Sequence, residues 1–486
     1  MNSMVRLLRR GLNRSPRALR SLLILIAVFG AVGTAAADAD VKFGGEFLTR
    51  YFYDNNMTDP RGNGVGPCRG PDGVPGTADD SCKDQESFAD ARFRLKIMAT
   101  EDIVTGVVLV DFFNGRQGRD AATLNAPLTG NGTGDRILGS QGFGQSLNTV
   151  DLREGYLRIS WPAAHLVIGR QAVTLGHAMI LDDTADAVAV AIPIGWASFT
   201  VMDLFLDNTA NGTGSTSAYL ADFNIDPTAA FKSSLFALFL KDRGPNLSFG
   251  QTAFFAPCGI GTSADCPVSN FGDDQATVAT LGWAMDRQGA SLRWATELDF
   301  LKGTIHTNDP TVLNPSGRDV KLKGGNALGE FGWTGGRLDA LLTGLYTTGQ
   351  KAADLPPNGG KMNINAISPN FVLGNILVNN ETTSDRDGGN IGGLTAAKLA
   401  IGFRPDAVFR AELAGIWARL TEEPAAQTSR SLGWEWDANA AWQLDPHLVL
   451  TGGFGFLISG KAWTVLFSDP RVNNMIKVST KLSYTF

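Results

Sequence analysis

The chain ends with the stretch MIKVSTKLSYTF, which runs from Met475 to Phe486. From Ile476 onward every second residue is apolar, aromatic or small, and the residues between them are Lys, Ser or Thr. Such alternation is typical of a β-strand whose two faces meet different surroundings. The last residues of soluble domains are usually frayed and polar. We therefore expect an ordered final strand in which Ile476, Val478, Leu482 and Tyr484 face lipid, Lys477 and Lys481 face the interior, and Phe486 lies at the periplasmic interface.

The same alternation recurs upstream. It is found in FADARFRLKIM (88–98), SLRWATELDF (291–300) and SLGWEWDANAAWQL (431–444), where Leu432, Trp434 and Trp436 oppose Glu435 and Asp437. Each segment has about 10 residues, the length of a tilted strand that crosses a bilayer. Soluble β-sandwiches alternate in the same way, so alternation alone does not decide the fold.

Aromatic residues and turn lengths favour a transmembrane barrel over a sandwich. The 28 Phe and 10 Trp accompany 57 Gly, and Tyr and Trp gather toward the ends of the alternating segments, as aromatic girdles do at the two membrane interfaces. Short turns alternate with long polar loops near 54–87, 115–149, 242–276, 302–325 and 348–392. Short periplasmic turns and long extracellular loops are a rule of outer-membrane barrels.

The segments predict an all-β transmembrane antiparallel barrel that forms one domain over residues 38–486. Eighteen strands are expected, near 41–53, 88–99, 103–114, 150–161, 165–176, 188–193, 196–206, 217–225, 231–241, 277–286, 290–301, 326–333, 337–347, 393–403, 407–420, 431–443, 447–457 and 474–486. Alternation is poor in 188–193, and 248–256 is either a loop hairpin or an extra strand. A barrel of sixteen strands is the alternative.

Residues 1–37 are expected to be a secretory signal peptide. Six Arg precede the apolar run LLILIAVFGAV, and the small residues GTAAADA follow it, which favours cleavage after Ala37. The segment holds 6 of the 42 basic residues and no acid, so the mature chain has 36 basic against 48 acidic residues. This balance disfavours nucleic acid as a partner.

The four cysteines predict two local disulfides in an oxidising compartment, Cys68 with Cys82 and Cys258 with Cys266. Asp72, Asp79 and Asp80 lie in the first of these Gly-rich loops and resemble a calcium loop, but their spacing does not match an EF-hand. A solvated acidic loop is the favoured reading, and we expect no other cofactor or metal.

Charged residues on the polar faces of the segments are expected to line the pore, where water keeps them solvated and they set the local potential. They are Arg92, Arg94, Lys96, Arg153, Glu154, Arg158, Arg170, Arg293, Glu297, Arg410, Glu412, Glu435 and Asp437. Some could instead form cross-strand pairs that stiffen the wall. Arg170 has two interpretations: it holds a carboxylate in the lumen, or it anchors the acidic segment LDDTAD (181–186).

Several segments resemble the alginate-export and related outer-membrane porin families. These are VKFGGEFLTRYFY at 41–53, REGYLRISWPAAHLVIGRQAVTLGHAMI at 153–180, GWEWDANAAWQLDPHLVLTGGFGFLISG at 433–460 and the closing KLSYTF. The resemblance implies an eighteen-stranded barrel with an Arg-rich lumen and a terminal aromatic signal, here Tyr484 and Phe486, for the barrel-assembly machinery. Because acids offset the inward bases here, a conduit for a polyanion is less expected than a differently selective channel.

We therefore expect a porin of a Gram-negative outer membrane that passes small hydrophilic or charged solutes by diffusion, surrounded by lipid. The alternatives are a dedicated exporter or importer of an acidic saccharide and a barrel-based receptor or adhesin. The four histidines, His165, His177, His306 and His447, form no convincing triad with a serine, so catalysis is not expected. The sequence leaves the oligomeric state open.

Overall fold

A computed structural model describes the chain in residues 39–55, 85–117, 150–208, 215–242, 275–306, 319–349, 361–363, 371–377, 393–423, 429–462 and 474–486. The strands are β1 (Asp40–Asn55), β2 (Gln85–Glu101), β3 (Val104–Gln117), β4 (Val150–Trp161), β5 (Ala164–Thr174), β6 (Asp182–Ile194), β7 (Ala197–Asn208), β8 (Ser215–Thr228), β9 (Phe231–Asp242), β10 (Gln275–Gln288), β11 (Leu292–His306), β12 (Val320–Gly335), β13 (Leu338–Thr347), β14 (Lys361–Asn363), β15 (Leu394–Phe403), β16 (Phe409–Leu420), β17 (Ser431–Asp445), β18 (Leu448–Ser459) and β19 (Met475–Thr485). No helix in these ranges is long and apolar enough to cross a membrane.

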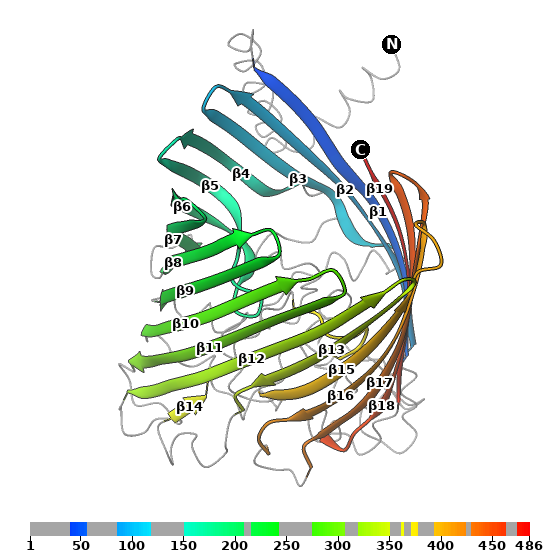
Figure 1. Cartoon of the computed structure of the whole chain (residues 1–486). Coiled ribbons are helices and arrows are strands. Elements are labelled where there is room, and N and C mark those ends of the chain that lie inside the picture. Colours follow the sequence, from blue (N-terminus) through cyan, green and yellow to red (C-terminus); the bar gives the residue numbers. More distant parts are fainter. Residues whose placement is uncertain are drawn as a thin grey trace, which may run out of the picture.

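The strands form a closed barrel (Figure 1). Each strand pairs antiparallel with its neighbours, and β1 pairs with β19 from Glu46↔Thr485 to Asn55↔Ile476. Of the 19 strands in the described sheet, β14 lies outside the ring, because it pairs only with β12, in parallel and over three residues. The wall described here therefore has eighteen strands, so the main prediction is confirmed and the sixteen-stranded alternative is wrong.

Short turns gather around one mouth of the barrel, at the top of Figure 1. Backbone hydrogen bonds join neighbouring turns there, for example from Ser160 N to Ile103 O and from Thr485 N to His447 O. The predicted turns at 161–165, 226–230, 286–289, 334–336, 404–407 and 444–447 all lie at this mouth. β6 is longer than the predicted 188–193, because it also takes in 182–187, which includes most of the acidic segment 181–186.

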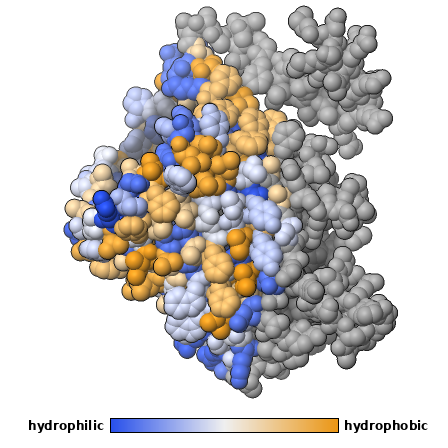
Figure 2. All heavy atoms as spheres, turned by 90° about the vertical axis from the view of Figure 1, so that its right-hand side faces the viewer, coloured by the Kyte–Doolittle hydropathy of each residue, from blue (hydrophilic) through white to orange (hydrophobic). Residues whose placement is uncertain are grey.

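The outward face of the wall is apolar. Phe43 is 64 % exposed and Leu413 is 66 % exposed, and exposed apolar side chains recur at every second position of the strands. Figure 2 shows apolar residues spread over the side where β19 closes on β1. An outward apolar band with aromatic residues toward its edges is the surface that a bilayer requires.

A β-bulge near Gly433 breaks the alternation in β17. Gly433 has a φ of +116°, and the pairing with β16 shifts between Ala418 and Arg419. Leu432 therefore points inward and is fully buried, whereas Trp434 is 52 % exposed. The prediction that both side chains share the outward face is wrong for Leu432, since the bulge inserts one extra residue.

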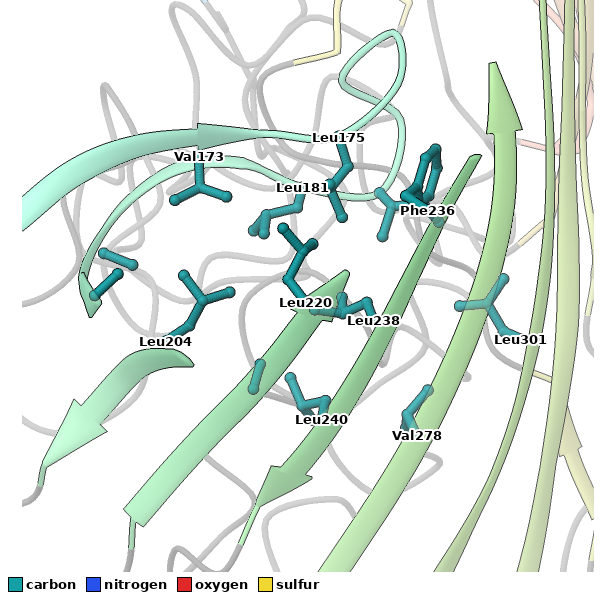
Figure 3. Close-up of a cluster of buried hydrophobic side chains, with 14 of the residues drawn as sticks. Val173, Leu175, Leu181, Leu204, Leu220, Phe236, Leu238, Leu240, Val278 and Leu301 are labelled. Atoms are coloured by element: carbon teal, nitrogen blue, oxygen red, sulfur yellow. The ribbon is translucent and has the colours of Figure 1, made fainter. Parts of the chain in front are cut away.

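The inner side of the barrel carries an apolar patch on β7 to β12 as well. Inward residues of β7 to β12 form a buried cluster with residues of the β5–β6 hairpin (Figure 3). Its wall members include Leu204, Leu220, Phe236, Leu238 and Leu240. Barrel interiors are usually polar and wet, so another part of the chain has to shield these apolar side chains from water.

The last strand closes the barrel as its alternation predicts. Leu482 and Tyr484 are exposed on the outward face, and Lys477 is 4 % exposed on the inward face. Phe486 and Gly45 exchange backbone hydrogen bonds of 3.0 and 3.2 Å, and the Phe486 ring stacks on Phe93 at 6.2 Å between centroids. The final aromatic residue is thus fixed at the short-turn mouth.

Candidate functional site

The β5–β6 hairpin leaves the wall and folds into the barrel. β4 pairs with β5 only as far as Gly155↔Arg170, and β6 pairs with β7 only from Asp186↔Phe205 onward. Beyond these points 171–174 pairs with 182–185 as a two-stranded ribbon. Gly169 lies where β5 leaves the wall and has a φ of +123°, a backbone conformation that residues other than glycine rarely adopt.

One face of this ribbon covers the apolar inner wall. Val173, Leu175 and Leu181 pack against Leu204, Leu220 and Leu238 (Figure 3). Leu175 is 1 % exposed and Leu204 is fully buried. Burial of a leucine side chain contributes about 1.5–3 kcal/mol, so the hydrophobic effect holds the hairpin inside the barrel.

The tip of the hairpin is fixed to β10 and β11. The backbone N–H of His177 donates to Glu297, and the His177 ring places Nδ1 3.1 Å from Glu297 Oε2 and Nε2 3.1 Å from Asp286 Oδ2. Glu297 is fully buried, and Asp299, two residues along the same strand, is 1 % exposed. The hairpin tip therefore lies against two acidic residues of β11, Glu297 and Asp299.

Segment 371–377 is a second inward element and is held in the same way. Asn375 N donates to Asp437 Oδ2 at 3.1 Å, and Ile376 N and Leu377 N donate to the two oxygens of Glu435 at 2.7 Å each. Ile376 and Leu377 are each 1 % exposed, in a cluster with inward residues of β12 to β19. Lys398 adds a bond of 2.7 Å from Nζ to the Leu373 carbonyl.

The inner wall of β1 to β4 and β19 is polar and charged. Arg94 makes a two-pronged contact with Asp111, with Nε–Oδ1 of 2.6 Å and Nη2–Oδ2 of 2.8 Å, and Arg153 Nε lies 3.8 Å from the same carboxylate. Glu46 accepts from Arg92 at 2.5 Å and from Ser483 at 2.8 Å. Cross-strand pairs therefore hold part of the predicted ring of charges.

A polar cavity of about 180 Å³ separates this wall from the hairpin. Arg94, Leu109, Arg153 and Glu154 line it from the wall, and Ala172, Asp182 and Thr184 line it from the hairpin. The second face of the hairpin thus looks onto water-accessible space, while its first face is dry. The hairpin therefore narrows the lumen on this side.

The structure separates the predicted pore residues into groups. Arg92, Arg94, Arg153 and Glu154 lie together on the charged wall, and Lys96 and Arg158 are exposed on the same inner face. Arg410 contacts Asp339 at 3.3 Å and Glu412 at 3.2 Å on the inner face of β13 and β16, and Arg293 is exposed near the short-turn mouth. Glu297, Glu435 and Asp437 point inward but are buried beneath the two inward segments.

Arg170 lies at the edge of the charged wall, in register with Gly155 of β4, and its side chain binds the hairpin. Its guanidinium contacts Thr184 Oγ1 at 3.3 Å and Asp186 Oδ1 at 3.8 Å. Both partners belong to the segment 181–186, so these contacts favour the anchoring interpretation over carboxylate capture. Cys68, Cys82, Cys258 and Cys266, the acids Asp72, Asp79 and Asp80, the signal peptide 1–37 and segment 248–256 lie outside the described residues.

Sequence reasoning missed the two elements that constrict the lumen. Their sequences are LGHAMIL (175–181) and FVLGNIL (371–377), and both hold Leu-Gly, then His or Asn, and a closing Ile-Leu. Each is an apolar run in or beside a segment expected to be a polar loop. That repeated pattern is the signal that could have identified them.

The fold is similar to that of solved porins. A BenF-like porin from Pseudomonas fluorescens Pf-5 aligns with a TM-score of 0.53 at 10 % identity, over 93 % of this chain and 99 % of that chain. OccK8 (OprE) of Pseudomonas aeruginosa aligns with a TM-score of 0.52 at 10 % identity, over 92 % and 98 %. OccAB4 of Acinetobacter baumannii aligns with a TM-score of 0.51 at 9 % identity, over 92 % and 98 %. No protein-family model and no curated protein matches the sequence.

Proposed function

We propose that the protein is a channel of a Gram-negative outer membrane that passes small hydrophilic solutes by diffusion and prefers anions. The observation that carries this proposal is a closed barrel in which two inward segments cover two apolar patches of the inner surface, so that the charged wall faces the remaining lumen. Similarity in fold to solved porins supports the same class. A lumen of this kind requires no chemical step, so we propose no enzymatic activity.

The charge of this wall supports the preference for anions. Among its described side chains the bases are Lys42, Arg50, Arg92, Arg94, Lys96, Arg153, Arg158, Lys477 and Lys481, and the acids are Asp40, Glu46, Asp111 and Glu154. Rings of basic side chains lower the barrier for anions in a pore. Interactions between exposed charges fall off within about 8–10 Å at physiological salt, so the preference should weaken as salt rises.

The test is single-channel conductance in planar bilayers, with the reversal potential measured across a salt gradient. We expect anion selectivity that decreases when Lys96 and Arg158, both exposed on this wall, are changed to Gln. Arg293→Gln is the matched control, because Arg293 is an exposed base on the far side of the barrel. Arg170→Ala should leave selectivity unchanged, since Arg170 contacts Thr184 and Asp186 of the hairpin. A protein that folds but carries no current would refute the channel and favour the receptor or adhesin.

An acidic saccharide is the second candidate solute, because the same basic wall would attract its carboxylates. Its exporter or importer would be blocked transiently by uronate oligomers in the same bilayers, and Lys96→Gln would shorten the blocks. A general channel would show no such block. The other proposed partners are outer-membrane lipids around the apolar band and the barrel-assembly machinery at Tyr484 and Phe486.

A further inference from the structure

The two inward segments share one structural device. Gly176 precedes His177 and lies against Glu297, and Gly374 precedes Asn375 and lies against Glu435. A Cβ on Gly176 would lie 2.5 Å from Glu297 Oε2, and a Cβ on Gly374 would lie 2.8 Å from each oxygen of Glu435. Glycine therefore lets each backbone approach a buried carboxylate closely enough for the N–H groups that follow it to donate.

The two inward segments differ in the other groups that hold them to the wall. Segment 371–377 is held by backbone N–H groups and by the Lys398 side chain, with no imidazole. The hairpin tip uses one backbone N–H and an imidazole. Imidazole is the side chain that gains or loses its charge closest to neutral pH, so loss of the ring proton can release the hairpin attachment.

Acids surround the His177 ring. Asp286 of β10 and Glu297 of β11 contact it directly, and Asp299 of β11 lies next to Glu297. The base closest in register is Lys232 of β9, which pairs with Asp286. A neutral ring would leave Glu297 buried without its cationic partner, which is unfavourable.

We propose that His177 is a positioning residue that latches the hairpin tip onto β10 and β11, which makes the hairpin the releasable constriction of the channel and segment 371–377 the permanent one. This inference rests on the proposed function only for its effect on current. When the latch opens, Val173 and Leu181 still pack against the wall, and Met179 of the tip stays in the buried cluster of segment 371–377. The movement is therefore confined to the turn around His177 while the ribbon stays inside. The expected consequence is a pore that flickers between substates rather than one that opens fully.

The pH at which the latch opens follows from the surroundings of the ring. Burial disfavours the charged imidazole, but the hydrogen bond to Glu297 and the charge of Asp286 outweigh it and raise the pKa of His177 from 6.5 to about 9. His177 lies in the turn between β5 and β6, outside the membrane-spanning strands. The latch is fully formed below pH 6.5, weakens as pH rises above this value, and is lost above about 9.

The first experiment records open-channel current of the full-length protein in planar bilayers across this pH range. Wild type should be quiet at neutral pH, and its current noise should rise with a midpoint near pH 9. His177→Gln should be noisy at every pH, with the midpoint lost. A quiet His177→Gln channel, or one that keeps the alkaline midpoint, would overturn the proposal.

Gly176→Ala tests the latch without changing any charge. Its Cβ would push the tip from Glu297, so we expect noise at neutral pH. Gly195→Ala is the control: Gly195 has a φ of +61°, close to the +55° of Gly176, but a Cβ there meets nothing within 4 Å. If both variants are equally quiet or equally noisy, the contact with Glu297 is not the cause and the proposal fails.

Amide hydrogen exchange tests the latch without a current. In His177→Gln, residues 175–181 should exchange faster than in wild type at the same pH, and residues 371–377 should be unchanged. Equal exchange of 175–181 in both proteins would refute the latch, whether or not the protein conducts. A protein that shows the exchange difference but no current would instead refute the channel function.

Discussion

Replacing Glu435 by Gln should detach segment 371–377 from the wall while leaving the barrel closed. Glu435 is fully buried and uses both oxygens, one for Ile376 N and one for Leu377 N, at 2.7 Å each. Glutamine keeps the shape of the side chain and one acceptor oxygen. Its amide NH₂ group then faces the N–H of Ile376 or of Leu377, and two donors cannot form a hydrogen bond. One backbone N–H thereby loses its acceptor, at a cost of about 1–3 kcal/mol.

This cost predicts the size of the effect. A local opening made easier by about 1–3 kcal/mol speeds amide exchange roughly five- to 150-fold. The change should be confined to 371–377, because segments open as local cooperative units. Strands β16 to β18 keep their own ladder and should retain their protection.

Hydrogen exchange read by mass spectrometry on the folded protein measures this directly. Glu412→Gln is the control, since Glu412 is also an inward glutamate, on the neighbouring strand β16, but it pairs with Arg410 at 3.2 Å and not with the segment. Faster exchange in 371–377 with Glu435→Gln alone is the expected result. Equal rates in both variants would show that the carboxylate does not hold the segment, and the reasoning about both acid pairs would be refuted.

Three further predictions concern the wall. Deleting Phe486 should reduce the fraction of assembled barrel, measured by heat-dependent gel mobility of membrane extracts, because the residue exchanges backbone bonds with β1 at the closing seam; an unchanged fraction would contradict this. Phe236→Ala should lower stability in urea by about 3–5 kcal/mol, since the ring is 1 % exposed, and Phe239→Ala on the outward face of the same strand should cost less; equal losses would argue against a dry inner core. Gly433→Ala should cost about 1–3 kcal/mol in the same assay, because φ is +116° and a Cβ would strike the Ile458 carbonyl, whereas Gly452→Ala, with no atom closer than 4.0 Å, should be tolerated; similar costs would contradict the role of the bulge.

The strands of the wall could be predicted from sequence because the two faces of each strand meet different surroundings, which produces the alternation of apolar and polar residues. Where alternation is strong, as in 475–486, the inward or outward face of the residues was predicted correctly. Exceptions have local causes. Leu432 points inward because of the bulge at Gly433, a backbone feature that period-two counting cannot detect.

The two inward segments could not be predicted, because the alternation of apolar and polar residues continues after a strand has left the wall. β5 continues to alternate through Gln171 to Thr174 after it has left β4, so nothing in its periodicity marks the departure. The acids Glu297 and Glu435 were predicted to point inward, and they do, but the long-range contacts that bury them come from residues 120 and 58 positions away. Contacts at such separations depend on tertiary packing rather than on local pattern.

The apolar patch on the inner side of β7 to β12 limits how this protein could be widened into a sensing nanopore. Deleting residues 171–185 would expose Leu204, Leu220, Leu238 and Leu240 to the lumen. The lumen would then be charged on one side and hydrophobic on the other. Hydrophobic constrictions in pores shed water and block ions. The shortened protein should therefore conduct little more than its parent until those leucines are changed to serine or threonine, and conductance of the two versions would measure how much of the bore is wetted.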